Sequence, residues 1–356
     1  MKIRFVDNHR VSSGSSYFSA FVSRQTIFIL VCGSLLGFSI AIMTVMSFGA
    51  NYEDRPIIIY NARQQEGIAP TDGGSLSDTL YREVKVLCWV MTNPANHKTK
   101  AWSVRQTWGQ RCNKLLFMST ESDGDLQPVV LPFSEGREQL WNKTREAFKH
   151  VYDHYLEEFD WFLKADDDTY VVMENLRYML YPYSSEDPIY FGYRFKDYYN
   201  EIEQGYMSGG AGYVLSRDAL RRFVEEAYPM RNENCSSGDV YKAEDNELGR
   251  CLQAVGVKAG DSREGYQERF HPFVPAHHFF DQFRFAPESE NWFKNMSWYP
   301  HLHGWGCCSN RSITFHYIEP EMMYVYHYFL YFLRPVGVNY NAITVLPQKL
   351  PSQTLK

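Results

Sequence analysis

The sequence predicts an α/β fold in which a parallel or mixed β-sheet is flanked by helices. Three observations predict this fold and a membrane anchor ahead of it. Short apolar runs alternate with amphipathic helical segments through the central part of the 356-residue chain, a pattern typical of helices covering both faces of a sheet. A cluster of acids follows one of the apolar runs, at the carboxyl end of an expected strand, where sheets of this kind bind their ligands. A separate uncharged segment near the N-terminus predicts a single transmembrane helix ahead of the folded part.

Continuous apolar runs mark the expected strands. Residues 84–92 (VKVLCWVMT) form the first, and such a run is typical of a strand buried on both faces of a sheet. Similar runs occupy residues 114–120, 128–133, 160–165 and 189–195. We expect these segments to form the sheet.

Helical periodicity appears between the strands. From residue 137 to 158 one face is apolar, and it is formed by Leu140, Ala147, Phe148, Val151 and Tyr155. A second helix is expected in residues 172–180. Residues 213–227 pass from a strand into a helix, with Ser216 as the expected N-cap.

The uncharged segment spans residues 27–48, which is long enough to cross a bilayer as a helix. The apolar region of a signal peptide is usually shorter, at about 7 to 15 residues. Basic residues precede the segment and acidic residues follow it, namely Lys2, Arg4, Arg10, Arg24, Glu53 and Asp54. Because positive charge stays cytoplasmic, we expect a single-pass type II membrane protein whose large part is luminal.

These signals divide the chain into five segments. We expect a cytosolic tail in residues 1–26, a transmembrane signal anchor in 27–48, a luminal stem in 49–82, a catalytic domain in 83–335 and a C-terminal tail in 336–356. The net charge of −6 comes without a basic block, so a nucleic-acid partner is not expected.

The cysteines suit an oxidising compartment. Cys32 lies in the anchor, and the other six form an even set, as expected of a disulfide framework. Six cysteines allow 15 pairings, so the sequence leaves the connectivity open. Short loops favour Cys88 with Cys112 and Cys235 with Cys251, which leaves the adjacent pair Cys307 and Cys308. A zinc site is the rival interpretation, but the sequence has no CxxC pair.

Four sequons also suit a luminal domain, at Asn142, Asn234, Asn295 and Asn310.

Three adjacent acids, Asp166, Asp167 and Asp168, follow the apolar run at 160–165. Asp168 could cap a helix that starts near Tyr170. A calcium-binding EF-hand is excluded, because its loop needs glycine at the sixth position, where this chain has Val171. The third interpretation is a divalent cation that holds a diphosphate, with Asp166 and Asp168 converging on one ion.

A cation here would serve the transfer of a sugar from a nucleotide, because the diphosphate leaving group develops negative charge. The acceptor hydroxyl must also lose a proton to a base. Glu244 and Asp245 stand at the start of an expected helix in residues 242–252 and are candidates for that base. The alternative is that they cap this helix.

Several stretches together resemble the core 1 β1,3-galactosyltransferase family. They are RQTWGQRC, GREQLWNKTREAF, WFLKADDDTYVVMENLR, YMSGGAGYVLSRDAL, EDNELGRCL, HPF and WYPHLHGWGCCSNRSITFHYIEP, and they cover nearly all of residues 83–335 in order. The resemblance implies a GT-A glycosyltransferase fold in a Golgi type II membrane enzyme that uses Mn²⁺. It also implies inverting transfer of galactose from UDP-galactose to the 3-hydroxyl of GalNAc on Ser or Thr of glycoproteins.

The resemblance also implies roles for individual residues. Asp168, Asp166 and His316 would hold the metal, and Asp166 would also reach the donor. Asp245 would be the catalytic base, with Glu244 as its neighbour. Donor contacts would come from Gly136, Arg137, Glu138, Lys143, Gly209, Gly210, Gly212 and Tyr324. Trp305 would contact the acceptor substrate.

The sequon at Asn142 lies inside this presumed donor site, so we expect it to carry no glycan or Asn142 to face away. The resemblance also suggests a homodimer and a dedicated chaperone as partners.

Two rival functions stay open. The first is a catalytically inactive luminal binding or chaperone relative, although such a relative of the family lacks the acids that this chain keeps. The second is a β1,3-glycosyltransferase of the same fold with another donor or acceptor, because donor choice depends on a few hydroxyl contacts.

Overall fold

The computed structural model describes residues 39, 75–228, 235, 243–280, 292–337 and 345–351. The chain divides into two compact units, Met1–Gly67 and Ile68–Lys356, and the second is the folded domain. Apart from Ser39, the predicted anchor and cytosolic tail lie outside the described residues. Within the described residues, no helix has the length and apolar character needed to cross a membrane.

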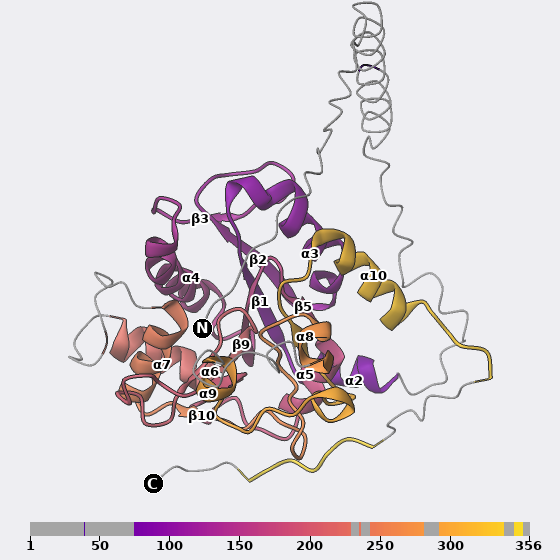
Figure 1. Ribbon diagram of the computed structural model, residues 1–356. Helices are drawn as coiled ribbons and strands as arrows, with labels where there is room; N and C mark the ends of the chain where they lie inside the picture. Colours follow the sequence, from indigo (N-terminus) through magenta and orange to yellow (C-terminus); the bar gives the residue numbers. More distant parts are fainter. Residues whose placement is uncertain are drawn as a thin grey trace, which may run out of the picture. The chain divides into compact units, whose positions relative to one another are not determined.

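A sheet of seven strands, counted over the described part of the chain, forms the centre of the domain in the order β10-β6-β9-β4-β1-β2-β3 (Figure 1). Its strands are β1 (Val86–Met91), β2 (Lys114–Ser119), β3 (Val129–Val130), β4 (Trp161–Asp166), β6 (Ile189–Gly192), β9 (Tyr213–Ser216) and β10 (Lys258–Ala259). Strand β1 pairs in parallel with β2 and β4, whereas β9 runs antiparallel to both β4 and β6. The predicted mixed sheet is therefore confirmed.

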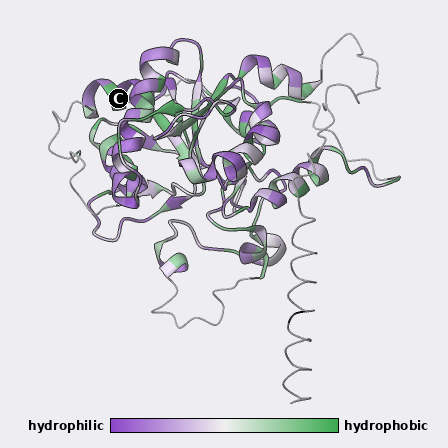
Figure 2. Ribbon diagram, turned by 90° about the horizontal axis from the view of Figure 1, so that it is seen from above, coloured by the Kyte–Doolittle hydropathy of each residue, from purple (hydrophilic) through white to green (hydrophobic). Residues whose placement is uncertain are grey.

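Helices cover both faces of this sheet. They are α2 (Leu76–Glu83), α3 (Trp102–Gln106), α4 (Leu140–Tyr155), α5 (Met173–Leu180), α6 (Arg217–Arg222), α7 (Glu244–Ala254), α8 (Pro275–Phe280), α9 (Trp292–Met296) and α10 (Pro320–Tyr331). Short 3-10 or π turns occupy Pro94–Asn96, His97–Ala101, Trp108–Arg111, Arg137–Gln139, Phe223–Ala227 and Gly304–Gly306. Figure 2 shows the apolar strands between helices whose outer surfaces are largely hydrophilic.

Strand β1 is apolar throughout because both of its faces are buried. Every residue of the strand is buried. Cys88 and Val90 enter the core cluster on one face of the sheet, and Leu87 and Trp89 enter the cluster on the other. Successive side chains of a strand point to opposite faces, so a strand between two helical layers needs apolar residues at every position.

Two predicted strands differ from the structure. The run at 128–133 yields only β3, Val129–Val130, at the edge of the sheet. The run at 189–195 divides, because β6 ends at Gly192 and β7 (Arg194–Phe195) leaves the sheet to pair with β8 (Tyr206–Met207). A second small sheet joins β5 (Tyr170–Val171) to β11 (Thr314–Phe315). The predicted cap at Ser216 is confirmed, since its hydroxyl accepts a hydrogen bond from the Ala219 N–H at 3.0 Å.

The folded domain extends beyond the predicted boundaries of 83 and 335. Helix α2 lies in the predicted stem, begins with a capping box at Ser75, and buries Leu80. At the other end, Leu350 donates a backbone hydrogen bond to the Pro182 carbonyl at 2.7 Å. Leu346 also packs against the core. Residues on both sides of the predicted range of 83–335 therefore pack against the folded domain.

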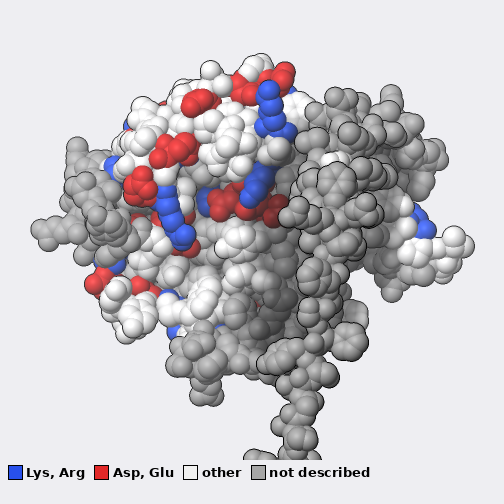
Figure 3. All heavy atoms as spheres, turned by 45° about the horizontal axis from the view of Figure 1, so that its top comes forward, with Lys and Arg blue, Asp and Glu red and all other residues white. Residues whose placement is uncertain are grey.

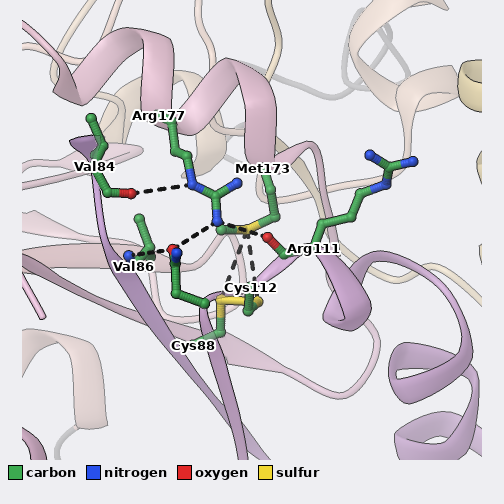
Figure 4. The surroundings of a disulfide bond; sticks show 8 residues. Val84, Val86, Cys88, Arg111, Cys112, Met173 and Arg177 are labelled. Atoms are coloured by element: carbon green, nitrogen blue, oxygen red, sulfur yellow. Dashed lines mark hydrogen bonds between the residues drawn. A yellow bond between two sulfur atoms is a disulfide. The ribbon is translucent and has the colours of Figure 1, made fainter. Parts of the chain in front are cut away.

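Three disulfides form with the pairing favoured by loop length: Cys88–Cys112, Cys235–Cys251 and the adjacent Cys307–Cys308. Figure 4 shows the first beneath α5, where the Met173 sulfur lies 3.8 Å from the Cys88 sulfur. The buried Arg177 guanidinium donates to the carbonyls of Val84 and Arg111, and burial lowers the pKa of this side chain to about 10. The first disulfide and Arg177 together join the start of β1, α5 and the 3-10 turn Trp108–Arg111.

Candidate active site

The three acids lie at the carboxyl end of β4, in the middle of the sheet, and each has a different environment. Asp167 is buried, and its carboxylate accepts hydrogen bonds from the Thr92 hydroxyl at 2.7 Å and the Asn96 amide at 2.9 Å. Burial raises the pKa of Asp167 to about 6, against the effect of these two hydrogen bonds. Asp167 thus holds the loop that follows β1 against the end of β4.

Asp166 and Asp168 face His316 instead. The His316 Nε2 lies 3.1 Å from an Asp168 oxygen and 3.9 Å from an Asp166 oxygen. Ligand atoms of the three residues all lie within 4.8 Å of one another. The pairing of β11 with β5 brings His316 to this place from 148 residues further along the chain (316 − 168).

The charges around Asp168 keep it ionised. Although burial opposes ionisation, the hydrogen bond and charge of His316, together with the ammonium of Lys100, lower the pKa of Asp168 to about 2. The Lys100 Nζ lies 3.0 Å from the second Asp168 oxygen.

The helix-cap interpretation of Asp168 is wrong. Residues 170–171 form β5 rather than a helix, and α5 begins later, at Met173. Its N-cap is Val172, whose side chain carries no hydrogen-bonding group.

A cleft of about 710 Å³ opens at this end of the sheet. The loop after β1, the start of α4 and the acids of β4 surround it. Of the predicted residues, Gly136, Arg137, Lys143, Asp166, Asp168 and His316 line it. Figure 3 shows lysine or arginine atoms beside aspartate or glutamate atoms near the middle of one face of the molecule.

Lys143 is buried at the base of this cleft. Its ammonium lies 3.0 Å from both carboxylate oxygens of Glu135 and 3.2 Å from the Thr92 carbonyl oxygen. The cleft therefore holds a buried ammonium group whose carboxylate partner is Glu135.

The second pair of acids begins α7 but does not cap it. The N-cap is Ala243, whose methyl group cannot accept a hydrogen bond. The Glu244 carboxylate is buried, accepts a hydrogen bond from the Tyr213 hydroxyl at 2.6 Å, and lies 3.9 Å from the ammonium of Lys164. Asp245 is half-buried and accepts a hydrogen bond from the Gly209 N–H at 2.9 Å.

These contacts distinguish the two candidate bases. Glu244 is buried and engaged by a hydroxyl and a cation inside the protein, whereas Asp245 is half-buried and accepts hydrogen bonds from the backbone N–H groups of Gly209 and Asn246. Burial raises the pKa of Asp245 above its ordinary value, against the hydrogen bond from Gly209. Burial raises the pKa of Glu244 as well, so the pKa does not separate the two acids. The half-buried position of Asp245 favours it as the candidate base.

Two consecutive glycines, Gly209 and Gly210, connect two acidic centres: Glu244 with Asp245, and Asp166 and Asp168 with His316. A Cβ atom added to Gly209 would lie 2.8 Å from a Glu244 oxygen, and one added to Gly210 would lie 2.2 Å from the His316 Cε1. Their carbonyl oxygens accept hydrogen bonds from Lys164 at 3.1 Å and Thr169 at 2.8 Å. Glycine is required here because both centres touch the same backbone.

Lys164 lies between the two centres. Its side chain is only 1% exposed, and its ammonium lies 2.6 Å from Asp166. The charges of Asp166 and Glu244 raise the pKa of this ammonium, although burial opposes this. Lys164 therefore balances acids from both centres.

Other predicted site residues do not line the described part of the cleft. Glu138 is exposed beside Gly136, and Tyr324 is half-buried on α10. Trp305 is 90% exposed and meets Phe279 edge-on. Their donor or acceptor roles stay predictions.

The sequons have varied positions. Asn142 lies in the first turn of α4, donates a side-chain hydrogen bond to Gln139 at 3.1 Å, and is not among the described residues that line the cleft. Asn295 and Asn310 are exposed, and Asn234 lies outside the described residues.

The loop after β1 was not predicted as part of the site, although it supplies Thr92, Asn96 and Lys100 to the cleft. A signal was present, because ligands in open α/β sheets bind beyond the carboxyl ends of strands and this loop follows the first apolar run of the folded part.

The chain is similar to several known proteins. A family model described as Fringe-like matches residues 82–271. The chain is 48% identical over 271 residues to glycoprotein-N-acetylgalactosamine 3-beta-galactosyltransferase 1 of Xenopus laevis, which covers 76% of this chain and 72% of that protein.

More distant relatives match smaller shares. Chondroitin sulfate synthase 3 of Homo sapiens and beta-1,3-glucosyltransferase of Mus musculus are each 26% identical, over 52% and 53% of this chain and 22% and 37% of those proteins. A solved structure of the galactosyltransferase LgtC with donor and acceptor sugar analogs aligns at a TM-score of 0.39 and 11% identity, over 70% of this chain and 98% of that chain.

The Fringe-like match spans more than half of the 356 residues, and the Xenopus relative shares nearly half of the aligned positions. The chain therefore belongs to the Fringe-like family and, with its acids and His316 gathered at one end of the sheet, to the core 1 β1,3-galactosyltransferases.

Proposed function

We propose that this protein is an inverting galactosyltransferase with a GT-A fold. It transfers galactose from UDP-galactose to the 3-hydroxyl of GalNAc α-linked to Ser or Thr of glycoproteins, and so makes Galβ1-3GalNAc. Family membership supports this function. The observation that carries it is that two acidic centres lie against consecutive glycines. Glu244 and Asp245 lie against Gly209, and His316, which adjoins Asp166 and Asp168, lies against Gly210.

The first centre suits a divalent metal. Two carboxylates and one imidazole, from Asp166, Asp168 and His316, lie close enough to share an ion, and this mixed oxygen and nitrogen set fits Mn²⁺. When bound there, Mn²⁺ would supply positive charge that stabilises the UDP leaving group.

The cleft residues would bind the donor. Gly136 and Arg137 lie at its rim, and the ammonium of Lys143 lies at its base. A lysine is a common point charge for phosphate oxygens, and Lys143 would exchange part of its contact with Glu135 for the diphosphate. The buried loop contacts of Asp167 keep the wall of the cleft in place.

The second centre would act on the acceptor. As the acceptor 3-oxygen forms a bond with the anomeric carbon, its proton passes to the Asp245 carboxylate. The bond from that carbon to the UDP oxygen breaks, and the electron pair leaves with UDP. A single displacement of this kind inverts the anomeric centre. Glu244 and Lys164 would hold Asp245 and Gly209 in place.

We also propose that the enzyme is a single-pass type II protein of the Golgi membrane with a luminal catalytic domain. The uncharged segment 27–48, the preceding basic residues and the three disulfides support this location. A homodimer and a dedicated chaperone remain proposals from the family.

The test uses the full-length protein in detergent with tritiated UDP-galactose, Mn²⁺ and GalNAc-α-benzyl. We expect metal-dependent transfer and a β1,3 linkage in the NMR spectrum of the product. Intact Mn²⁺ binding without transfer would instead identify a non-catalytic relative. A matched series with UDP-glucose, UDP-GlcNAc and UDP-glucuronic acid decides the donor, and a faster rate with any of them would overturn the galactose assignment.

A further inference from the structure

We propose that Tyr317 is a positioning residue for the metal ligand His316. Its left-handed backbone and its stacked ring together aim the imidazole at Asp168. This inference rests on the metal centre of the proposed function and adds a residue to its machinery.

The backbone of Tyr317 is unusual. Its φ is 59°, in the left-handed region, which bulky residues other than glycine rarely adopt. The other such residues in the described part of the chain are Gln127 and Asn200, at φ 52° and 55°. Asparagine tolerates this region well. A tyrosine does not, so the surrounding structure must stabilise the left-handed backbone of Tyr317.

Hydrogen bonds on both sides force this conformation. Before Tyr317, Phe315 pairs with Tyr170 in the small sheet, and the His316 N–H donates to the His271 carbonyl at 3.2 Å. After it, the Ile318 N–H donates to the carbonyl of Asp168 at 2.9 Å. The backbone therefore changes direction at Tyr317, between the hydrogen-bonded N–H groups of His316 and Ile318.

This reversal places the imidazole. The Nδ1 of His316 lies 3.3 Å from the Pro272 carbonyl, which leaves Nε2 to face Asp168 at 3.1 Å. A hydrogen bond on one ring nitrogen commonly orients the other toward a metal. The backbone at Gly210 passes close to the same ring, because a Cβ atom added there would lie 2.2 Å from Cε1 and 2.3 Å from Nδ1.

The tyrosine ring covers the imidazole. The ring centroids of Tyr317 and His316 lie 3.9 Å apart at an interplanar angle of 30°, and Tyr317 stacks on Phe273 at 6.1 Å. The side chain of Tyr317 is nevertheless 55% exposed, so burial of its ring accounts for little of the strain. Strained residues that persist in this way cluster at functional sites, and the site here is the metal ligand one residue away.

Three variants separate the contributions of ring and backbone. Tyr317→Phe keeps both, Tyr317→Asn keeps a tolerated left-handed backbone without the ring, and Tyr317→Gly releases both. Mn²⁺ affinity is measured on the full-length protein from the EPR signal of free Mn²⁺. We expect Kd within about twofold of wild type for Phe, several-fold weaker for Asn, and on the order of 10-fold weaker for Gly, as for the loss of other groups that orient a metal ligand.

Two controls keep the test specific. Gln127→Gly also relieves a left-handed residue, away from the described metal-ligating cluster, and should leave Kd unchanged; an equal loss in this variant would overturn the proposal. A wild-type Kd for Mn²⁺ in Tyr317→Gly would also overturn the proposal. If Tyr317→Gly does not fold, a wild-type Kd in Tyr317→Asn overturns it instead. Wild-type Mn²⁺ binding by Asp168→Ala would instead show that the metal centre itself lies elsewhere.

Discussion

Replacing Gly210 by alanine tests the geometry of the proposed metal site most directly. The added Cβ would lie 2.2, 2.3 and 2.9 Å from the Cε1, Nδ1 and Nε2 of His316, whereas ordinary contact begins at 3.4 Å. The imidazole must therefore retreat by about 1.2 Å (3.4 − 2.2) if the backbone holds its place. The hydrogen bond from Thr169 to the Gly210 carbonyl limits backbone movement.

A retreat of this size takes Nε2 away from Asp168, which it approaches to 3.1 Å. A misplacement of about 1 Å can reduce a rate on the order of 100-fold, which corresponds to about 2.7 kcal/mol of transition-state stabilisation. We therefore expect kcat/KM for galactose transfer to fall by roughly that factor. Mn²⁺ affinity should weaken in parallel.

The assay compares Gly210→Ala with Gly306→Ala, using radiolabelled transfer and Mn²⁺ titration of both proteins. Gly306 is the matched control, because a Cβ there would meet its nearest neighbour, Leu302, at 3.9 Å. The reasoning fails if Gly210→Ala keeps the wild-type rate and Mn²⁺ affinity.

The same contacts give four further predictions. Asp245→Asn should keep UDP affinity, measured by calorimetry, and lose about 10²- to 10⁴-fold in kcat; near-normal turnover would move the base elsewhere, to Glu244 first. Because burial raises the pKa of Asp245 and the ionised form accepts the proton, activity should fall as pH drops through that raised value, and a kcat/KM profile that stays flat down to about pH 4 would contradict this. Lys164→Met leaves buried acids without their cation and should lower the free energy of unfolding by about 3–5 kcal/mol in urea; a loss under about 1 kcal/mol would argue against the charge balance. Removing the Cys88–Cys112 bridge, which closes a loop with a sequence separation of 24, should cost about 3–4 kcal/mol in the same measurement, whereas unchanged stability would show that the bridge restrains nothing in the unfolded chain.

The elements predicted well are those whose signal is local. Strands β1 and β4 are continuous apolar runs, and α4 shows its period over 16 residues. A continuous apolar run indicates a strand buried on both faces, and a helical period indicates a helix buried on one face. Neither pattern depends on which element packs against it. The resemblance to a family added the order of the remaining segments and pointed to His316, which no local pattern marks.

The elements predicted poorly depend on their partners. The run at 128–133 is apolar enough for a strand, yet only Val129–Val130 finds a neighbour, β2, at the sheet edge. The chain after Gly192 leaves the sheet because β8 pairs with it. The predicted stem includes α2 because Leu80 finds a buried place in the core. No local pattern reports such distant pairings.

The sequence by itself determined the chemistry that the site offers: adjacent carboxylates after a buried strand, a second acid pair and a glycine-rich stretch. The tertiary structure decided which of them act together. It brought His316 beside Asp168 through the pairing of β11 with β5, assigned Asp167 to the loop after β1, and gave Asp245 and Glu244 different partners. The physical reason is that the character of a residue type is local, whereas distances of 3 to 4 Å between groups far apart in the chain exist only after the core has packed.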